Sequence, residues 1–230
     1  MSSPIKVISF DLDDTLWPCY PTIIRAEKKL YRWLRENVTA ITDIYSEEQL
    51  SKKRQRLLHS RSDLVHDLTA LRLLFFKQLA AELKIADEWV EPAFKIFYQA
   101  RQQVTLYDDV KPVLDHLIQK FCLVSLTNGN ADTVKTGVDH WFEHSISSIE
   151  VGESKSEPAI YRYVQKLINI DAHQMVHIGD DPVNDIAGAK KAGIHAVWLN
   201  RDEREWPLQG YRPDATINHL HQLPDIISKL

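Results

Sequence analysis

The residues that could carry chemistry stand directly after short apolar segments of the sequence. Acidic residues follow two of these segments, and they are Asp11, Asp13, Asp14, Asp180, Asp181 and Asp185. Thr127 and Asn128 follow a third segment, and Lys155 lies between Asn128 and the second acidic group. If the segments are parallel strands, their carboxyl ends meet at one edge of a sheet, where α/β proteins bind ligands. The sequence therefore predicts that carboxylates, a hydroxyl group and an ammonium group converge at that edge.

This set of groups is typical of a divalent cation beside an anionic substrate. Crowded carboxylates need a cation to stay ionised, and oxygen ligands without His or Cys favour Mg²⁺. Lys155 and Thr127 beside spare carboxylates indicate that the substrate is an anion. A carboxylate can act as the nucleophile at a phosphoryl group and form an aspartyl-phosphate. The second acid of Asp11-x-Asp13 could protonate the leaving group and later activate water.

The elements that must position these residues alternate between strand and helix. Short apolar runs rich in β-branched residues predict strands over Ile5–Phe10, Phe121–Leu126, Ile146–Ile149, Gln174–Ile178, His195–Leu199 and Ala215–Ile217. Helical patterns lie between them, near Asp109–Lys120, Ala131–His140, Ala159–Ile168 and Pro182–Ala192. Such alternation favours a parallel sheet covered by helices on both faces.

The segment after the first strand has a different character. Glycine is absent before Gly129, and proline is absent from Thr22 to Glu91, which argues against tight turns. Apolar residues recur there at helical spacing, as in Leu64, Leu68, Leu71, Phe75 and Leu79. We therefore expect residues 1–17 and 107–230 to form an α/β domain and residues 18–106 to form an inserted bundle of about four helices.

Four short motifs resemble those of one known family. They are DLDDT at Asp11–Thr15, SLTNG at Ser125–Gly129, Lys155 within GESKSEPAIY, and HIGDDPVNDIAGAKKAG at His177–Gly193. In this order and with this insertion, the chain is similar to the haloacid dehalogenase-like (HAD) phosphohydrolases that carry a helical cap after the first motif. The resemblance implies a Rossmann-like parallel sheet, a helical cap domain over residues 18–106, and a Mg²⁺-dependent phosphatase.

The resemblance also implies a role for each acidic motif residue. Asp11 would be the nucleophile and a ligand of Mg²⁺. Asp13 would be the general acid and base, and its backbone carbonyl would also bind the metal. Asp180 would complete the metal shell, and Asp181 and Asp185 would support it.

The other motif residues would bind the phosphoryl group. Thr127 and the backbone at Asn128 would hold its oxygens, and Lys155 would neutralise their charge. The chain departs from many relatives at Ser156, where they have proline after the lysine. This departure puts the rigidity of the loop in question rather than the charge of Lys155.

Other functions share this fold and stay open. A phosphosugar mutase uses the same phosphoenzyme, and a test for phosphate release would separate the two activities. A 2-haloacid dehalogenase also uses a first aspartate but needs no metal and resembles sequences that lack the second acid, so Asp13 argues against it. A non-catalytic binding module would lack a motif residue, and none is missing. The sequence indicates neither which small phosphorylated metabolite is the substrate nor an oligomeric state.

Composition excludes several classes of partner. The chain has 230 residues with 28 Lys+Arg and 32 Asp+Glu, a net charge of -4, so it lacks the basic excess of a nucleic-acid-binding protein. No apolar run approaches the length of a membrane span. The first fourteen residues end in a group of aspartates, and such acidic residues do not fit the pattern of a signal peptide. Two cysteines without metal-ligand spacing are typical of a reducing compartment, and we expect a cytoplasmic protein.

Four residues outside the motifs have two interpretations each. Trp17 and Tyr20 could line a substrate entrance, but we favour packing at a hinge between the domains. Arg72 and His66 could meet the substrate from a cap helix, but we favour a solvated helix face.

Overall fold

The structure is a computed structural model that describes residues 5–230, so residues 1–4 of the expected first domain lie outside the described residues. The chain divides into two compact units. The sheet unit consists of Thr105–Leu230 together with the segment that ends at Pro18, and the helical unit consists of Cys19–Val104. The interpretation of the helical unit as a cap stays a prediction. Among the described residues, none of the helices combines the length and apolar character that a membrane crossing requires.

A six-stranded parallel sheet forms the centre of the sheet unit. Its strands are β1 (Val7–Phe10), β2 (Cys122–Thr127), β3 (His144–Ser147), β4 (Met175–Gly179), β5 (His195–Leu199) and β6 (Ala215–Ile217). Their spatial order is β3-β2-β1-β4-β5-β6, the order of a Rossmann sheet. The predicted α/β fold with a Rossmann-like sheet is therefore confirmed.

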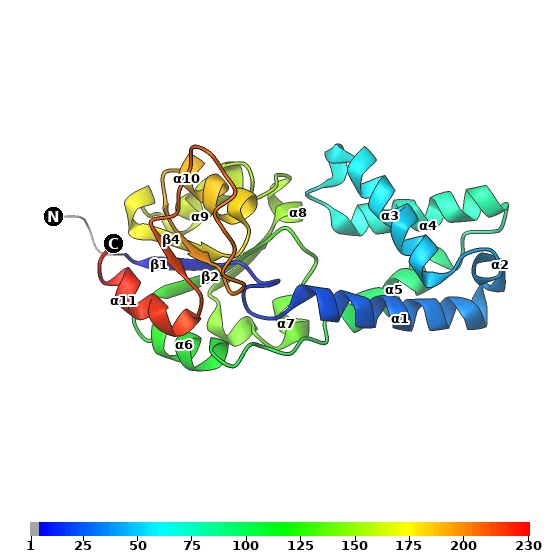
Figure 1. The fold of residues 1–230 in the computed structure, drawn as a ribbon, viewed down its shortest axis with the longest axis horizontal. Coiled ribbons are helices and arrows are strands. Elements are labelled where there is room, and N and C mark those ends of the chain that lie inside the picture. Colours follow the sequence, from blue (N-terminus) through cyan, green and yellow to red (C-terminus); the bar gives the residue numbers. More distant parts are fainter. Residues whose placement is uncertain (1–4) are drawn as a thin grey trace. The chain divides into compact units, whose positions relative to one another are not determined.

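Helices cover both faces of this sheet, which explains why its central strands are buried throughout. They are α6 (Val110–Leu117), α7 (Thr133–Thr136), α8 (Ser148–Val151), α9 (Ala159–Ile168), α10 (Gly188–Lys191) and α11 (Leu223–Ile227). Three short 3₁₀ turns accompany them, η2 (Asp139–Trp141), η3 (Ala172–Gln174) and η5 (Leu220–Gln222). Figure 1 shows α9 and α10 on one side of the strands and α6 and α11 on the other.

Two predicted helices differ from the structure. The helix expected near Ala131–His140 is wrong in length, because α7 ends at Thr136 and the following Gly137, with a left-handed φ of 78°, closes the helix. The helix expected over Pro182–Ala192 is divided into a π-helical turn, η4 (Pro182–Ala187), and α10.

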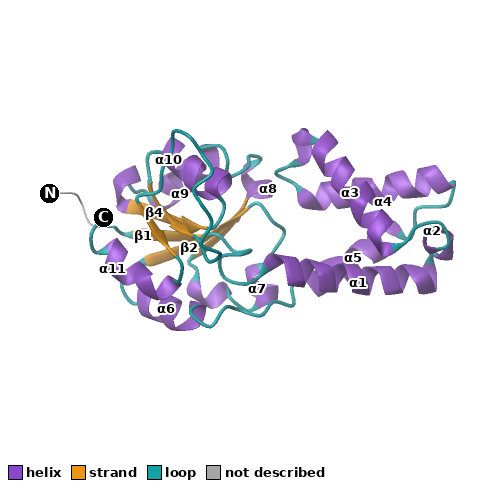
Figure 2. Cartoon of the chain, in the orientation of Figure 1, coloured by secondary structure: helices purple, strands orange, loops and turns teal. Residues whose placement is uncertain are grey.

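The helical unit contains no strand within Cys19–Val104, as the colours of Figure 2 show. Its elements are α1 (Cys19–Asn37), α2 (Thr39–Thr42), α3 (Glu47–Ser60), the 3₁₀ turn η1 (Ser62–Leu64), α4 (Leu68–Leu83) and α5 (Val90–Arg101). Ser46 and Gln49 form a capping box that begins α3, and Asp67 accepts the Ala70 N–H at 2.8 Å to begin α4. The core of the unit consists of apolar side chains from all five helices, mostly leucine, alanine and phenylalanine residues of α1, α4 and α5.

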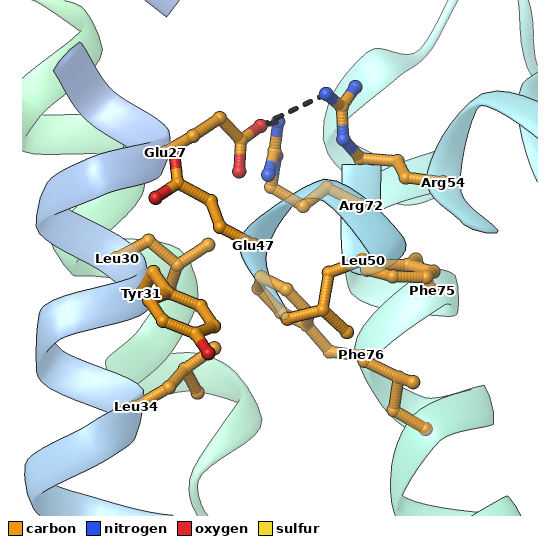
Figure 3. A pocket seen from close by; sticks show the side chains of 11 residues that line it. Glu27, Leu30, Tyr31, Leu34, Glu47, Leu50, Arg54, Arg72, Phe75 and Phe76 are labelled. Carbon is orange, nitrogen blue, oxygen red and sulfur yellow. Dashed lines mark hydrogen bonds and ion pairs between the residues drawn. The ribbon is translucent and has the colours of Figure 1, made fainter. Parts of the chain in front are cut away.

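Charged residues also lie inside the helical unit. Glu27 pairs with Arg72 at 2.8 Å and with Arg54 at 3.1 Å, and the guanidinium of Arg72 lies 3.3 Å from the centre of the Phe97 ring. Only 7% of the Arg72 side chain is exposed, so its interpretation as part of a solvated face is wrong. Figure 3 shows these charges and Glu47 at one end of a cavity whose other walls are mostly apolar, including Leu30.

Burial and charge act in opposite directions on these groups. Burial alone would raise the pKa of Glu27, but the charges of Arg72 and Arg54 outweigh it and hold that pKa below its usual range. Burial lowers the pKa of Arg72 to about 10, although Glu27 opposes the change. One carboxylate thus serves two arginines, and the buried Arg72 is the less well compensated member of the pair.

The chain leaves the sheet unit after Pro18 and returns at Thr105. Next to these two points, the Tyr107 N–H donates to the Leu16 carbonyl at 3.0 Å. Arg201 donates to the Thr15 carbonyl at 3.0 Å and also pairs with Asp109 at 2.9 Å. The outgoing and returning segments therefore run side by side within the sheet unit.

Candidate active site

The register of the central strands brings the predicted residues to one edge. Phe10 is level with Ser125 on β2 and with Ile178 on β4. Asp11 follows β1 at once, and its N–H donates to the Ile178 carbonyl at 2.9 Å. Thr127 ends β2, and Asp180 directly follows β4. Strand pairing alone thus gathers the ends of three segments that are far apart in the sequence.

Three carboxylates lie together at this edge. Asp11, Asp180 and Asp185 each offer an oxygen, and these oxygens all lie within 4.8 Å of one another. Lys155 is buried among them, where its Nζ donates to Asp11 Oδ1 and to Asp185 Oδ1, the latter at 2.6 Å. Burial would lower the pKa of Lys155, but the charges of Asp11 and Asp185 outweigh it and raise that pKa. The ammonium group is therefore charged and faces more than one carboxylate.

The carboxylates do not share this positive charge equally. Burial would raise the pKa of Asp185, but Lys155 and the bond from His177 hold it well below its usual range. Burial, followed by the charge of Asp185, raises the pKa of Asp11 to about 7 although Lys155 opposes the rise. Burial and the charges of Asp185 and Asp11 raise the pKa of Asp180 to about 9. Lys155 pairs with Asp11, and Arg204 lies 3.8 Å from Asp180 Oδ2, yet burial and the neighbouring carboxylates still raise the pKa of both acids.

A divalent cation fits this imbalance. The donors are all oxygens, which suits a hard ion such as Mg²⁺. Both oxygens of Asp185 already accept hydrogen bonds. Oδ1 accepts from Lys155 and His177, and Oδ2 accepts from the Asp181 N–H at 2.9 Å. Asp11 and Asp180 are therefore the better candidates for metal ligands, and Asp185 supports Lys155.

Asp181 has a local structural role. Its Oδ1 accepts the N–H groups of Val183 and Asn184, both at 2.8 Å, and so caps the turn η4. The Asp185 and Ile186 N–H groups then both donate to the Asp181 carbonyl, at 2.9 and 3.3 Å, which widens the turn. The side chain of Asp181 is therefore engaged with the helix end, while Asp185 reaches the carboxylate cluster.

The sequence did not single out His177, which is completely buried in β4. Its Nδ1 lies 2.9 Å from Ser9 Oγ, and its Nε2 lies 3.1 Å from Asp185 Oδ1. Burial lowers its pKa although Asp185 opposes the change. A signal was available, because Ser9 and His177 are polar residues at paired positions of two otherwise apolar strands. His177 helps to fix Asp185, which in turn holds Lys155.

The side chain of Asn128 organises the loop that carries Lys155. Its Oδ1 accepts the Lys155 N–H at 2.8 Å, and its Nδ2 donates to Ser154 Oγ and to Asn184 Oδ1, both at 3.1 Å. The family resemblance implies a role only for the backbone of Asn128, and these side-chain contacts are additional. Ser156, which replaces proline here, donates from Oγ to Ser154 Oγ at 3.3 Å, so hydrogen bonds restrain this loop.

Two glycines permit the close packing behind the site. A Cβ at Gly179 would lie 2.2 Å from Asp185 Cγ. A Cβ at Gly188 would lie 1.8 Å from the Lys155 carbonyl oxygen. Both distances are far below van der Waals contact, so these positions accept no side chain without a shift of Asp185 or of the Lys155 loop.

The first-motif loop brings Trp17 to Asp13. The indole Nε1 donates to Asp13 Oδ1 at 2.8 Å, and the ring is fully buried. Tyr20 has 75% of its surface exposed, so the expectation that both aromatic residues pack is wrong for Tyr20. Thr127 is buried, and its Oγ1 accepts the Gly129 N–H at 2.9 Å.

Comparisons with known proteins give the family. The family model for haloacid dehalogenase-like hydrolases matches residues 5–193. The 5-amino-6-(5-phospho-D-ribitylamino)uracil phosphatase YigB of Escherichia coli is 27% identical over 97% of this chain and 96% of its own. The N-acylneuraminate-9-phosphatase of Homo sapiens is 26% identical over 99% of this chain and 96% of its own. The crystal structure of a 2-haloacid dehalogenase from Pseudomonas syringae is 34% identical with a TM-score of 0.89, and the match covers 98% of this chain and 99% of that one. The chain belongs to the haloacid dehalogenase-like hydrolases.

Proposed function

We propose that this hydrolase is a Mg²⁺-dependent phosphatase that cleaves a small phosphomonoester through an aspartyl-phosphate on Asp11. The observation that supports this most is the group of carboxylates around Asp11. A nucleophilic carboxylate must be ionised to attack, yet burial and the charge of Asp185 raise the pKa of Asp11 to about 7. Magnesium held by Asp11, Asp180 and the backbone carbonyl of Asp13 would supply positive charge to the carboxylates and to the phosphoryl oxygens.

The chain's own residues carry the two chemical steps. An oxygen of Asp11 attacks phosphorus, and the bond from phosphorus to the leaving oxygen breaks as Asp13 gives that oxygen a proton. Lys155, Thr127 and the backbone N–H at Asn128 hold the phosphoryl oxygens during the transfer. Asp13 then takes a proton from water, and the hydroxide formed attacks the aspartyl-phosphate. Inorganic phosphate leaves, and Asp11 returns to its starting form.

Haloacid dehalogenation is the second candidate, because the structure with 34% identity is that of a 2-haloacid dehalogenase. In that reaction the first aspartate displaces halide from carbon, and no cation is needed. The crowding of Asp180 and Asp185 against Asp11 would then only hinder the nucleophile. Asp13, which is held by Trp17, would have no leaving oxygen to protonate. We therefore favour phosphate transfer.

The relatives indicate the class of substrate. Those that span nearly the whole chain are named for a phosphoribitylamino-uracil, an N-acylneuraminate 9-phosphate and a glyceraldehyde 3-phosphate. All three are small phosphorylated metabolites, so we assign this chain a substrate of that class.

A pair of release assays tests the function. Wild-type protein is incubated with a panel of phosphomonoesters and with L-2-chloropropionate, each with Mg²⁺ or with excess EDTA. Phosphate release that stops in EDTA and returns with Mg²⁺ is expected, with no chloride release. Chloride release that EDTA does not change would replace the proposal with dehalogenation. Turnover of a phosphosugar without free phosphate would indicate a mutase.

Two single-site variants test the roles of the first-motif acids with p-nitrophenyl phosphate. Asp13→Asn should give a burst of nitrophenol close to one equivalent and then a slow steady state, because only the second step needs its base. Loss of such a base typically lowers the rate ~10²–10⁴-fold. Asp11→Asn should give neither burst nor turnover, and a burst that persists would show that another residue is the nucleophile.

A further inference from the structure

We propose that Trp198 is a positioning residue that holds the backbone of Asp180 in the orientation that binds Mg²⁺. This inference rests on the proposed function, in which Asp180 is a ligand of the metal, and deepens it. Trp198 acts only through Asp180, and the proposal assigns to this indole an effect on the affinity of the site for the cation.

The indole of Trp198 contacts Asp180 at the point where the pairing of two strands stops. Gly179 ends β4, and it is level with Trp198 on β5. One residue beyond this pair, the Asp180 carbonyl accepts the Trp198 Nε1–H at 2.8 Å. A side chain therefore holds the backbone at the first residue after the strand, and this is the residue that carries the carboxylate.

A second hydrogen bond fixes the other end of the same peptide group. The N–H of Asp181 shares this peptide group with the Asp180 carbonyl, and it donates to Asp185 Oδ2 at 2.9 Å. A peptide group is planar, so partners at both ends oppose its rotation. Because β4 fixes the chain before Asp180 and this peptide group fixes it afterwards, the direction of the Asp180 side chain is set from both sides.

Arg204 is a further donor to the same carbonyl, at a longer distance. Its Nη2 lies 3.2 Å from the Asp180 carbonyl oxygen and 3.8 Å from Asp180 Oδ2. A turn presents this arginine, because Asn200 Nδ2 donates to the Arg204 carbonyl at 2.8 Å and Asn200 Oδ1 accepts the Arg204 N–H at 2.9 Å. The Arg204 side chain is 48% exposed, whereas Trp198 is only 3% exposed. The packed indole is therefore the more rigid of the two donors.

A fixed backbone favours metal binding because the ligands already lie together. Oxygens of Asp11 and Asp180 lie within 4.8 Å of each other. Loss of the indole N–H would release one end of the peptide group, and the Asp180 carboxylate would then be less often near Asp11. Hydrogen bonds that orient a metal ligand typically change the affinity for the metal by about 10–100-fold.

The test replaces Trp198 with benzothienylalanine, which keeps the shape of the bicyclic ring and lacks the N–H. Trp198→Phe is a second, genetically simpler variant. Trp206 is the matched control, because its ring packs edge to face on Trp198 with 5.0 Å between the ring centres. Its Nε1 is buried and has no hydrogen-bond acceptor in the part of the chain that the structure describes. Benzothienylalanine at position 206 therefore removes an N–H that holds no other group.

Metal affinity is measured on the folded protein without substrate. Mn²⁺ is titrated into each variant, and the electron paramagnetic resonance signal of free Mn²⁺ reports how much is bound. Competition by Mg²⁺ then gives the dissociation constant for Mg²⁺. The melting temperature in EDTA is measured in parallel, because a purely structural role of Trp198 would lower that temperature and leave the metal affinity unchanged.

We expect benzothienylalanine at position 198 to weaken Mg²⁺ binding about tenfold, at the lower end of the range for such hydrogen bonds. Trp198→Phe should also weaken it, and benzothienylalanine at position 206 should leave it unchanged. In an Arg204→Met background the substitution at Trp198 should weaken binding by at least the same factor, because neither side-chain donor then holds the carbonyl.

Three results would overturn the inference. They are an unchanged Mg²⁺ affinity in the Trp198 variants, an equal loss in the Trp206 control, and a smaller loss in the Arg204→Met background. If the wild type binds neither cation, the proposed Mg²⁺ dependence fails and the inference fails with it. If the wild type binds Mg²⁺ and the Trp198 variants bind it as tightly, only the inference fails, so the two failures are distinguishable.

Discussion

Loss of the Glu27 carboxylate should weaken the helical unit. This carboxylate is the partner of both Arg72 and Arg54. Glu27→Gln keeps the size of the side chain but removes the carboxylate with which both arginines pair. Breaking a buried ion pair in this way typically costs about 3–5 kcal/mol. The exposed fractions of the Glu27 and Arg54 side chains, 16% and 20%, place the expected cost near the lower end, at about 3 kcal/mol.

Hydrogen exchange measured by mass spectrometry can locate this loss. A cost of about 3 kcal/mol corresponds to roughly 100-fold faster opening, and amides of α1 and α4 should show it while amides of β1 and β4 do not. Glu48→Gln is the control, because it removes an ion pair with Lys52 whose side chains are 76% and 61% exposed. It should leave the exchange unchanged.

A double variant separates lost attraction from unpaired charge. Combining Glu27→Met with Arg72→Met removes the two more deeply buried charges and leaves Arg54, whose side chain is 20% exposed and can turn toward solvent. The thioether introduced by the second substitution would pack on the Phe97 ring in place of the present guanidinium. The two methionines have a similar volume to the residues that they replace. The free energy of opening measured by hydrogen exchange in this double variant should therefore lie within about 1 kcal/mol of the wild-type value. If the double variant is as unstable as Glu27→Gln, the cost does not come from the unpaired arginine and our reasoning is wrong.

Three other predictions follow from the geometry. The melting temperature measured by circular dichroism should fall as the pH drops below the ordinary glutamate pKa of 4.5 and through the lower folded pKa of Glu27. The reason is that only the ionised form of Glu27 stabilises the fold. In Glu27→Gln the melting temperature should depend less steeply on pH. Asp180→Asn should raise the Mg²⁺ concentration for half-maximal activity by about tenfold or more with an unchanged circular-dichroism spectrum. Gly188→Ala should lower kcat by about 100-fold, because its Cβ would lie 1.8 Å from the Lys155 carbonyl and must displace that loop. Gly137→Ala is the control for a loss of stability without a displaced site loop: its φ of 78° strains an alanine, but nothing lies within 4 Å of the added Cβ, and kcat should stay unchanged.

The centre of the sheet could be predicted because β1, β2, β4 and β5 are short and almost entirely buried runs, and the predicted acidic residues and Thr127 stand at the ends of such runs. The order of residues along the chain was enough to predict that Asp11, Thr127 and Asp180 lie at one edge. Helix lengths were less predictable, since the left-handed turn at Gly137 depends on how the chain continues to β3.

Residues whose partners are distant in sequence were the hardest to interpret. Arg72 lies 45 residues from Glu27, and its position between leucines is compatible with either a buried or an exposed side chain. His177 pairs with a serine on a neighbouring strand, and only the strand register brings the two together. Pairwise polar contacts of this kind depend on tertiary packing, which hydrophobic periodicity does not describe.

The side-by-side course of the outgoing and returning segments has a consequence for divergence. Because the Tyr107 N–H already bonds to the Leu16 carbonyl, residues 19–104 enter and leave at nearly one point. A single recombination cassette could therefore exchange the whole insertion between relatives without moving a strand or a carboxylate. Libraries that randomise only this cassette would leave every chemical group at the sheet edge unchanged, so a change in substrate preference among them would show that the insertion contributes to it.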